Sequence, residues 1–361
     1  MSTLTTNYLT PTGREEAWRF TPLARLKGLH DAATIVADRI SLSAGSSYEG
    51  VTFSTQPSVE NTPTSQTDDL VTQRVRDIAS QVTVVAIAAD AVLSTPISLG
   101  RKSGSAPEVS RTIIRAGVNS HATIVVENTG TGVFAEEIEI ILEPGANLRF
   151  ISLQEWDNDA VHLGRHHAII GRDATFTSVV VTVGGSLVRL LPTVEYAGPG
   201  ASAELFGLYF AGNGQHLEHR IHVDHNLADG KSRVNYKGAL SGDGARTVWI
   251  GDVFIRAAAE RTDTYELNRN LLLSDGARAD SVPNLEIETG DIVGAGHAST
   301  TGRFDDEQLF YLESRGIPAA EAKRLVIRGF FLEILSKIGI ENIEERIMNR
   351  IDQELSKVTI A

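Results

Sequence analysis

The chain of 361 residues contains no cysteine. Disulfide bonds are therefore excluded, and so is any thiolate ligand or thiol nucleophile from this chain. If the function involves sulfur or iron chemistry, another chain must supply the thiols. The hydrophobic content of 42% is ordinary for a globular protein, and the length allows two or three domains or one long repetitive domain.

Long apolar runs and an excess of positive charge are also missing. No stretch stays apolar for the ~18 residues that a transmembrane helix needs, so we expect none. Met1–Leu9 lacks the basic start and apolar core of a secretory signal, and we therefore expect a cytoplasmic protein. The net charge of −13 argues against nucleic acid or an anionic membrane as the main partner.

Several enzyme motifs have no match in the chain. There is no G-x-x-x-x-G-K-[ST] phosphate loop, and the glycine-containing run at 100–105 has neither its order nor its spacing. Neither a G-x-S-x-G nucleophile elbow nor an H-E-x-x-H metal motif occurs. None of these motifs therefore predicts an ATP site or catalytic residues on this chain.

Short β-rich runs separated by Gly, Asp and Asn turns fill the middle of the chain, with no helical segment of about twelve residues between them. A small turn recurs at intervals near 30 residues, each time followed by an alternating run. We predict a mainly β protein with a β-helix core over residues 82–300, and favour it over a β-sandwich. The five turns are Pro144-Gly145-Ala146, Arg172-Asp173-Ala174, Pro199-Gly200-Ala201, Asp243-Gly244-Ala245 and Asp275-Gly276-Ala277.

The N-terminal region, residues 1–81, is predicted to be helical with a flexible linker. Gly13–Leu29 has the apolar spacing of a short amphipathic helix, which Pro22 breaks or restarts. Residues 41–69 are rich in Ser, Thr, Gly and Pro, which is typical of a loop or linker. A further helix is expected from about Asp69 to Gln81.

Residues 301–361 are predicted to form a C-terminal helical domain, because apolar residues there recur at three and four. Such a unit can cap the end of a solenoid and can also serve as a docking platform. The expected helices run from Asp305 or Asp306 to Arg315, from Pro318 to about Ile338, and from Glu341 to Lys357. The residues expected on the buried side of the second helix are Ala322, Leu325, Ile327, Phe331, Leu335 and Ile338.

Histidines are the first candidates for chemistry. His216, His219, His222 and His225 are spaced by three in a β-like run, so alternate members would face opposite sides of a strand. We therefore favour hydrogen-bonded histidines on two faces over a four-histidine metal site, and leave their role open. The pair His166-His167, with His162 nearby, is assigned no function. His297 stands alone in a run of Gly, Ala, Ser and Thr, where strand periodicity gives way to helix; an isolated histidine is by itself a weak signal.

Four segments resemble the SufB/SufD family of iron–sulfur cluster assembly proteins. The two most specific are Asn268–Ile287 and His297–Gly316, and His216–Asn226 and the EEAWRFT run from Glu15 also fit. The resemblance covers residues 215–340 well and residues 40–110 loosely. Within the family the chain is more similar to SufD than to SufB, because it is short, has the N-terminal helical start and lacks the cysteines expected of a SufB-type scaffold.

The resemblance implies a right-handed parallel β-helix with helical regions at both ends. It implies a non-catalytic scaffold that pairs with SufB through the β-helix and docks the SufC ATPase on its C-terminal helices, at about residues 304–340. A transient iron–sulfur cluster, or iron, would lie at the SufB interface, and the chain would support iron acquisition by the complex. The sequence leaves open whether a homodimer forms without SufB.

The resemblance also assigns a role to one residue. His297 matches the family's functional interface histidine, which lies opposite a SufB cysteine, and is thereby a candidate iron ligand shared with that cysteine. Some SufD proteins carry a cysteine two positions before this histidine; Ala295 stands there in this chain. The thiolate role therefore does not transfer, whereas the imidazole role does.

Two other classes of function stay open beside this one. A β-helix enzyme acting on polysaccharide would need paired carboxylates on one face. The sequence offers Asp243, Asp252 and Asp263 but does not place them together. A homomeric structural β-solenoid would need no ATPase, and its function would not require a polar residue at the position of His297.

Overall fold

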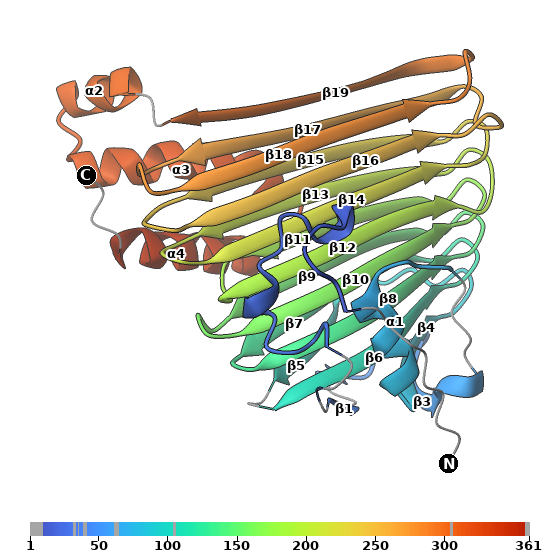
Figure 1. The fold of residues 1–361 in the computed structure, drawn as a ribbon. Helices are drawn as coiled ribbons and strands as arrows, with labels where there is room; N and C mark the ends of the chain where they lie inside the picture. The colour runs from blue at the N-terminus through green and yellow to red at the C-terminus, as the bar shows by residue number, and fades with distance from the viewer. Residues whose placement is uncertain are drawn as a thin grey trace.

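The computed structural model describes residues 10–31, 34, 36–38, 42–60, 65–103, 106–303 and 306–357. Its centre is a parallel β-solenoid in which, from residue 81 onward, successive strands alternate between two sheets, here called sheet A and sheet B (Figure 1). Sheet A contains β3 (Val51–Pro57), β4 (Gln81–Ile87), β6 (Pro107–Ala116), β8 (Val133–Leu142), β10 (Val161–Ile170), β12 (Leu187–Tyr196), β14 (His216–His225), β16 (Arg246–Ile255) and β18 (Arg278–Ile287), with β1 (Ala37–Asp38) beside β6. Sheet B contains β2 (Ser43–Ala44), β5 (Ile97–Ser103), β7 (His121–Gly130), β9 (Asn147–Trp156), β11 (Thr175–Thr182), β13 (Ser202–Ala211), β15 (Lys231–Leu240), β17 (Thr262–Leu272) and β19 (Ile292–Arg303). The predicted β-helix, rather than a sandwich, is confirmed.

The main hydrophobic core fills the space between the two sheets. Inward-facing residues of sheet A, such as Ile138 and Ile140, meet inward-facing residues of sheet B, such as Leu148 and Phe150. Parts of the outer faces are covered as well, so that Val179, Val180 and Val181 are consecutive apolar residues and all are buried. Strands buried on both faces are expected to lose polar alternation in this way.

The recurring turns belong to two stacks and not to one series. The first three copies join a strand of sheet A to the next strand of sheet B, whereas the last two join sheet B to sheet A on the other side of the solenoid. Within a stack, neighbouring turns are hydrogen-bonded: Gly145 N donates to Arg172 O at 2.9 Å, and Gly244 N donates to Gly276 O at 3.1 Å. The switch of side explains the one long interval, between Gly200 and Gly244.

The N-terminal region lies on the outer face of sheet A. The helix expected over Gly13–Leu29 is instead two short 3-10 helices, η1 (Glu16–Trp18) and η2 (Leu23–Arg25), because Pro22 separates them. The second expected helix is confirmed as α1 (Leu70–Ile78), and the side chain of Asp69 accepts a hydrogen bond from Thr72 N at its start. Trp18, Leu26 and Val75 pack together against sheet A.

The loop or linker predicted for residues 41–69 is wrong for Ser43–Ala44 and for Val51–Glu60. The segment contains β2, β3 and the 3-10 helix η3 (Ser58–Glu60), and residues 61–64 lie outside the described part of the chain. β3 pairs antiparallel with β4 along seven residues, from Val51↔Ile87 to Pro57↔Gln81. Residues 51–57 therefore form a strand because they pair with the free edge of β4, although their composition alone predicts a loop.

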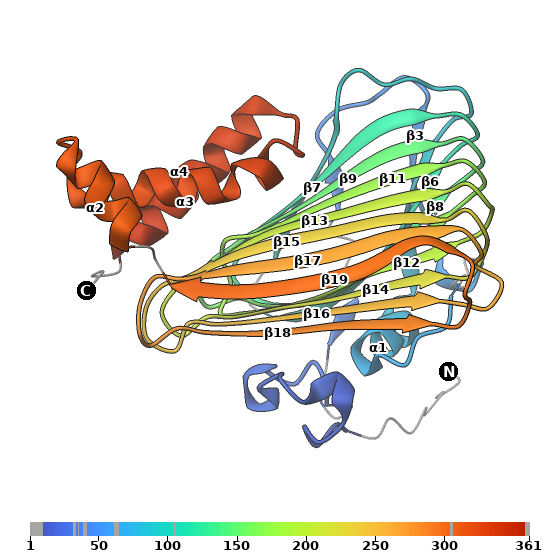
Figure 2. The same cartoon turned by 90° about the horizontal axis from the view of Figure 1, so that it is seen from above.

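The C-terminal helices are α2 (Asp306–Ser314), α3 (Ala319–Leu335) and α4 (Glu341–Lys357). α3 and α4 lie on the outer face of sheet B, on the opposite side of the solenoid from α1 (Figure 2). All but one of the residues expected on the buried side of α3 are buried; Leu325 is wrong, being 44% exposed. The proposed cap Asp305 lies outside the described residues.

The two ends of the solenoid differ. At the first end the antiparallel strands β2 and β3 close both sheets. At the other end β18 and β19 are the last strands of sheets A and B, and every residue in them is at least partly exposed. We call this the open end. Exposed strand edges invite pairing with another chain.

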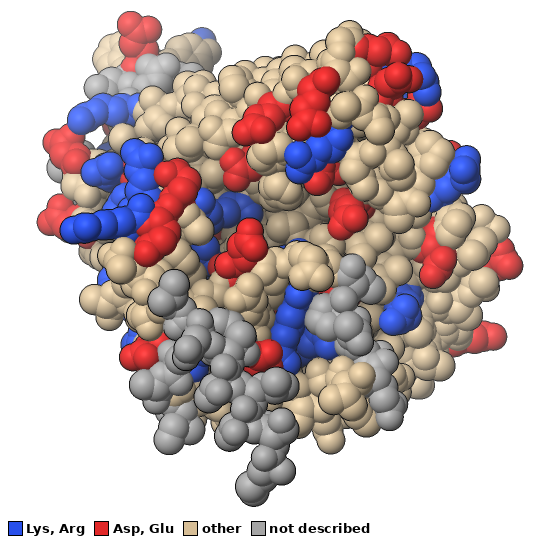
Figure 3. Space-filling view, turned by 45° about the vertical axis from the view of Figure 1, so that its right-hand side comes forward, with Lys and Arg blue, Asp and Glu red and all other residues tan. Residues whose placement is uncertain are grey.

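The surface carries charges of both signs. On the face shown in Figure 3, acidic and basic side chains lie interspersed and are separated by wide uncharged areas. Among the residues that the structure describes, no helix is long and apolar enough to cross a membrane.

Candidate functional site

His297 lies on β19, at the open end. It is in register with Glu266 of β17, and strand alternation places it on the inward-facing side, together with Ala295 and Ser299. Its side chain is 43% exposed, because no further coil covers it. The candidate imidazole is thus held by a regular strand and accessible from the open end.

Glu266 is the buried neighbour of His297. Its side chain is fully buried, and its Oε1 lies 3.7 Å from Nδ1 of His297. Neither carboxylate oxygen has a hydrogen-bond partner among the described residues. Burial, with a smaller contribution from the charge of Asp252, raises the pKa of Glu266 to about 8.

The polar residues beside Glu266 are bonded to one another. Asn268 donates through Nδ2 to the hydroxyl of Tyr209 at 2.8 Å, and Asn270 donates to Oδ1 of Asn268 at 2.7 Å. Ser281 of β18 donates to the same oxygen at 2.8 Å. Glu266 makes no hydrogen bond to this network. The network links sheets A and B just beneath the open end.

The four histidines of β14 lie on two faces, as predicted. His219 stacks on Tyr209, with 4.9 Å between ring centroids, and His225 stacks on Tyr196 at 4.7 Å, both inside the solenoid. His216 and His222 face outward; Nε2 of His216 lies 3.1 Å from Glu218. No group of three or more His, Cys, Asp or Glu side chains in the described parts of the chain is placed to hold a metal ion.

Acid is expected to destabilise the protein through His219. Burial lowers the pKa of His219 to about 3, whereas the pKa of a histidine in an unfolded chain is about 6.5. Between these pH values the unfolded state binds the extra proton, so stability falls as the pH falls. From pH 8 to pH 5, the free energy of unfolding should fall in both proteins. The fall should be about 2 kcal/mol smaller in His219→Phe than in the wild type. Urea unfolding at the two pH values measures this, and an equal loss in both proteins would contradict it.

A second polar cluster lies inside the solenoid at Glu136, which the sequence did not reveal. Arg101 pairs with Glu136, and both side chains are fully buried. His162 and His166 approach the same carboxylate at 3.2 and 3.4 Å. Burial opposes ionisation of Glu136, but Arg101 and the two histidines hold its pKa well below the usual value. We interpret this cluster as structural, because its charges are paired inside the core.

The carboxylates considered for a polysaccharide site do not come together. Asp243 lies in a turn, and Asp252 is on β16, where it accepts a hydrogen bond from Asn284 at 2.6 Å. Asp263 is on β17 of the other sheet and is paired with Arg233 at 2.7 Å. These three residues therefore form no catalytic pair.

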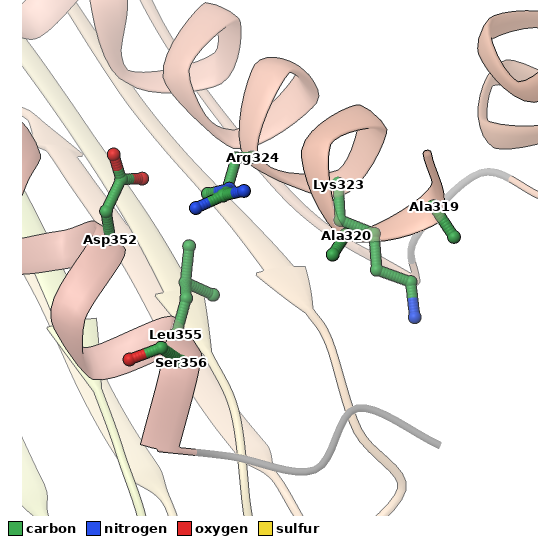
Figure 4. A pocket seen from close by; sticks show the side chains of 7 residues that line it. All are labelled: Ala319, Ala320, Lys323, Arg324, Asp352, Leu355 and Ser356. Atoms are coloured by element: carbon green, nitrogen blue, oxygen red, sulfur yellow. The ribbon is translucent and has the colours of Figure 1, made fainter. Parts of the chain in front are cut away.

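The C-terminal helices expose large apolar side chains. Phe310 and Tyr311 of α2 are 72% and 57% exposed, and Leu332 of α3 is 63% exposed. A pocket of about 400 Å³ opens between the start of α3 and the end of α4 (Figure 4). Its lining residues are Ala319, Ala320, Lys323, Arg324, Asp352, Leu355 and Ser356.

Comparison with known proteins gives consistent matches. The family model of the SUF system FeS cluster assembly SufBD core domain matches residues 100–330. An iron–sulfur cluster assembly SufBD family protein of Mycobacterium leprae is 44% identical over 367 residues, which cover 96% of this chain and 91% of that protein. A family member from Mycobacterium tuberculosis is 47% identical over 358 residues, covering 96% and 89% of the two chains. The iron–sulfur cluster assembly protein SufD of Escherichia coli is 30% identical over 210 residues, covering 58% of this chain and 49% of SufD.

Proposed function

Because the chain belongs to the SufBD family of iron–sulfur cluster assembly proteins, we propose that it is a SufD-like scaffold subunit of a SufBCD complex. It pairs with SufB through the open end of its solenoid, docks a SufC ATPase on its C-terminal helices, and has no catalytic activity of its own. The observation that carries this proposal is the position of His297 on the last strand of the open end, where a second chain can complete the site.

The open end supports pairing with another solenoid. Strands β18 and β19 leave the edges of both sheets free, and Ile287 of β18 and Val293 of β19 are 45% and 71% exposed. A partner with two matching edge strands would satisfy the backbone groups and cover these side chains. Since this chain has no cysteine, that partner must also bring the thiolates on which a cluster is built.

His297 supplies this chain's part of the chemistry. A neutral imidazole is a suitable ligand for iron, and one nitrogen together with a partner's thiolate would form a labile site. Iron and the nascent cluster are the cargo of such a site. The chain itself holds the imidazole in place and presents it at the interface.

The second part of the proposal concerns the ATPase. Phe310, Tyr311 and Leu332 expose apolar surface on α2 and α3, within the region 304–340 where SufC docking is expected; Phe304 lies outside the described residues. α3 packs on β13 and β15, so a force applied to the helices reaches the solenoid directly. ATP hydrolysis in SufC could in this way move the SufB interface.

Co-expression tests this function. The chain, produced with SufB and SufC of the same organism, is expected to elute from size exclusion as a complex of one copy of this chain, one SufB and two SufC. Mass determination on the eluted peak checks the composition. A chain that elutes alone or only with itself, while SufB and SufC assemble without it, would contradict the proposal.

A matched pair of variants locates the interface. Val293→Arg places a charge on the open end and should reduce copurification of SufB while SufC still binds. Val59→Arg places the same charge near the opposite end, where Val59 is 88% exposed, and should change neither. If the two variants copurified equal amounts of SufB, SufB would bind at a surface other than the open end.

A further inference from the structure

Glu266 occupies an unusual position for a carboxylate. It is fully buried, yet neither of its oxygens finds a hydrogen-bond partner among the described residues. Burying a polar group in this way costs free energy, which other buried acids in the chain avoid by pairing, as Glu136 does with Arg101. An unpartnered buried group of this kind calls for an explanation, and a missing ligand is one.

The fold makes room for this carboxylate. A Cβ atom added at Gly251, on the facing sheet, would lie 2.1 Å from Oε2 of Glu266 and 2.5 Å from the ring of Trp249. Glycine at position 251 therefore lets the carboxylate reach into the interior beside Trp249. On its other side Glu266 faces His297, which is exposed at the open end.

The spacing between Glu266 and His297 suits a metal better than a hydrogen bond. At 3.7 Å, Oε1 and Nδ1 are too far apart for a direct hydrogen bond. Two bonds of about 2.0–2.2 Å to one ion, at an angle of about 110–120°, would place a nitrogen and an oxygen ligand about 3.3–3.8 Å apart. Imidazole and carboxylate are also the two ligand types that hold ferrous iron in non-haem sites.

We propose that Glu266 is a second iron ligand on this chain, and that it holds one ferrous ion together with Nδ1 of His297. The inference rests on the proposed function of His297. Two ligands leave the coordination sphere incomplete, which agrees with the absence of any three-residue metal group among the described residues. Water fills the remaining positions in the isolated chain, and thiolates of the partner replace water in the complex.

Metal binding to the full chain tests the proposal directly. The purified chain is titrated at pH 8 without oxygen, with Fe²⁺ by calorimetry and with Co²⁺ by its visible absorption. We expect one ion per chain. Loss of an outer-shell partner of a metal ligand typically weakens a site by about 10–100-fold, so loss of a direct ligand, in Glu266→Gln or His297→Ala, should weaken binding by about tenfold or more. The matched control Asp263→Asn, which makes the same change on the outward face of β17, should bind as the wild type does.

The outcomes separate this inference from the proposed function. If Glu266→Gln binds both metals as tightly as the wild type while His297→Ala does not, Glu266 is not a ligand and the role of His297 stands. If the wild-type chain binds no metal, the inference is overturned, whereas the co-expression result with SufB and SufC is unaffected. The melting temperature without metal supplies a further check. It should be unchanged or higher in Glu266→Gln if the carboxylate serves the metal, and a clear decrease would indicate a structural role instead.

Discussion

Replacement of His297 with alanine is expected to lower the rate of cluster formation by the proposed complex about tenfold or more, because loss of even an outer-shell partner of a metal ligand typically costs about 10–100-fold. The imidazole is 43% exposed and lies on the last strand, so its loss removes the proposed ligand and little packing. The complex with SufB and SufC should therefore still form. The rate is followed by the visible absorption of the cluster after iron and a sulfur source are added without oxygen, and assembly is followed by size exclusion.

Ser299 provides the matched control for this variant. It lies two residues further along β19, on the same inward-facing side, and is also exposed. Ser299→Ala should form both complex and clusters at the wild-type rate. A normal rate in His297→Ala would remove His297 from the site. Loss of the complex in that variant alone would indicate that the histidine holds the interface together, and would contradict the expectation that the complex still forms.

The sequence identified His297 as a candidate site residue but did not identify Glu266. The reason is that Glu266 comes close to His297 only through the register of two strands. The resemblance to a known family identified the histidine as a candidate, because the motif around it is specific. Glu266 is 31 positions earlier in the chain and meets His297 because β17 and β19 are in register across one full coil. Because the number of residues in a coil varies along the chain, the residue that lies beside His297 on the neighbouring strand cannot be predicted from sequence spacing. Glu136 and its histidines were missed for the same reason.

The errors in the fold also have a common cause. The parallel core was predictable, since its strands and turns carry their own local signals of β-branched residues and glycine. Residues 51–57 carry weak signals, and the segment is a strand because β4 offers it a free edge. Similarly, Leu325 fits the helical period of α3 but falls outside the surface that sheet B covers. Local pattern predicted the elements, and tertiary contacts decided which of their faces are buried.

Glu137→Ala is expected to be a strongly destabilising substitution on the outer face of sheet A. The side chain of Glu137 is fully buried beneath α1 and lies within 3.4 Å of three guanidinium groups, those of Arg76, Arg111 and Arg165. Its removal leaves these buried positive charges close together with one fewer counter-charge. Breaking a buried ion pair in this way typically costs about 3–5 kcal/mol, which urea unfolding would measure.

The same variant should loosen the N-terminal region, because Arg76 anchors α1 to the sheet through Glu137. Limited digestion with trypsin should therefore cut within α1, at Arg74 or Arg76, faster than in the wild type. Asp275→Ala is the control, since its partner Arg303 and Asp275 itself are 74% and 88% exposed. An exposed pair of this kind contributes at most about 1 kcal/mol. If Glu137→Ala were no more destabilising than Asp275→Ala, the three arginines would have to be neutralised by other groups. The anchoring of the N-terminal region would then rest on its other contacts, such as the ion pair of Asp69 with Arg189 and the apolar packing of Trp18.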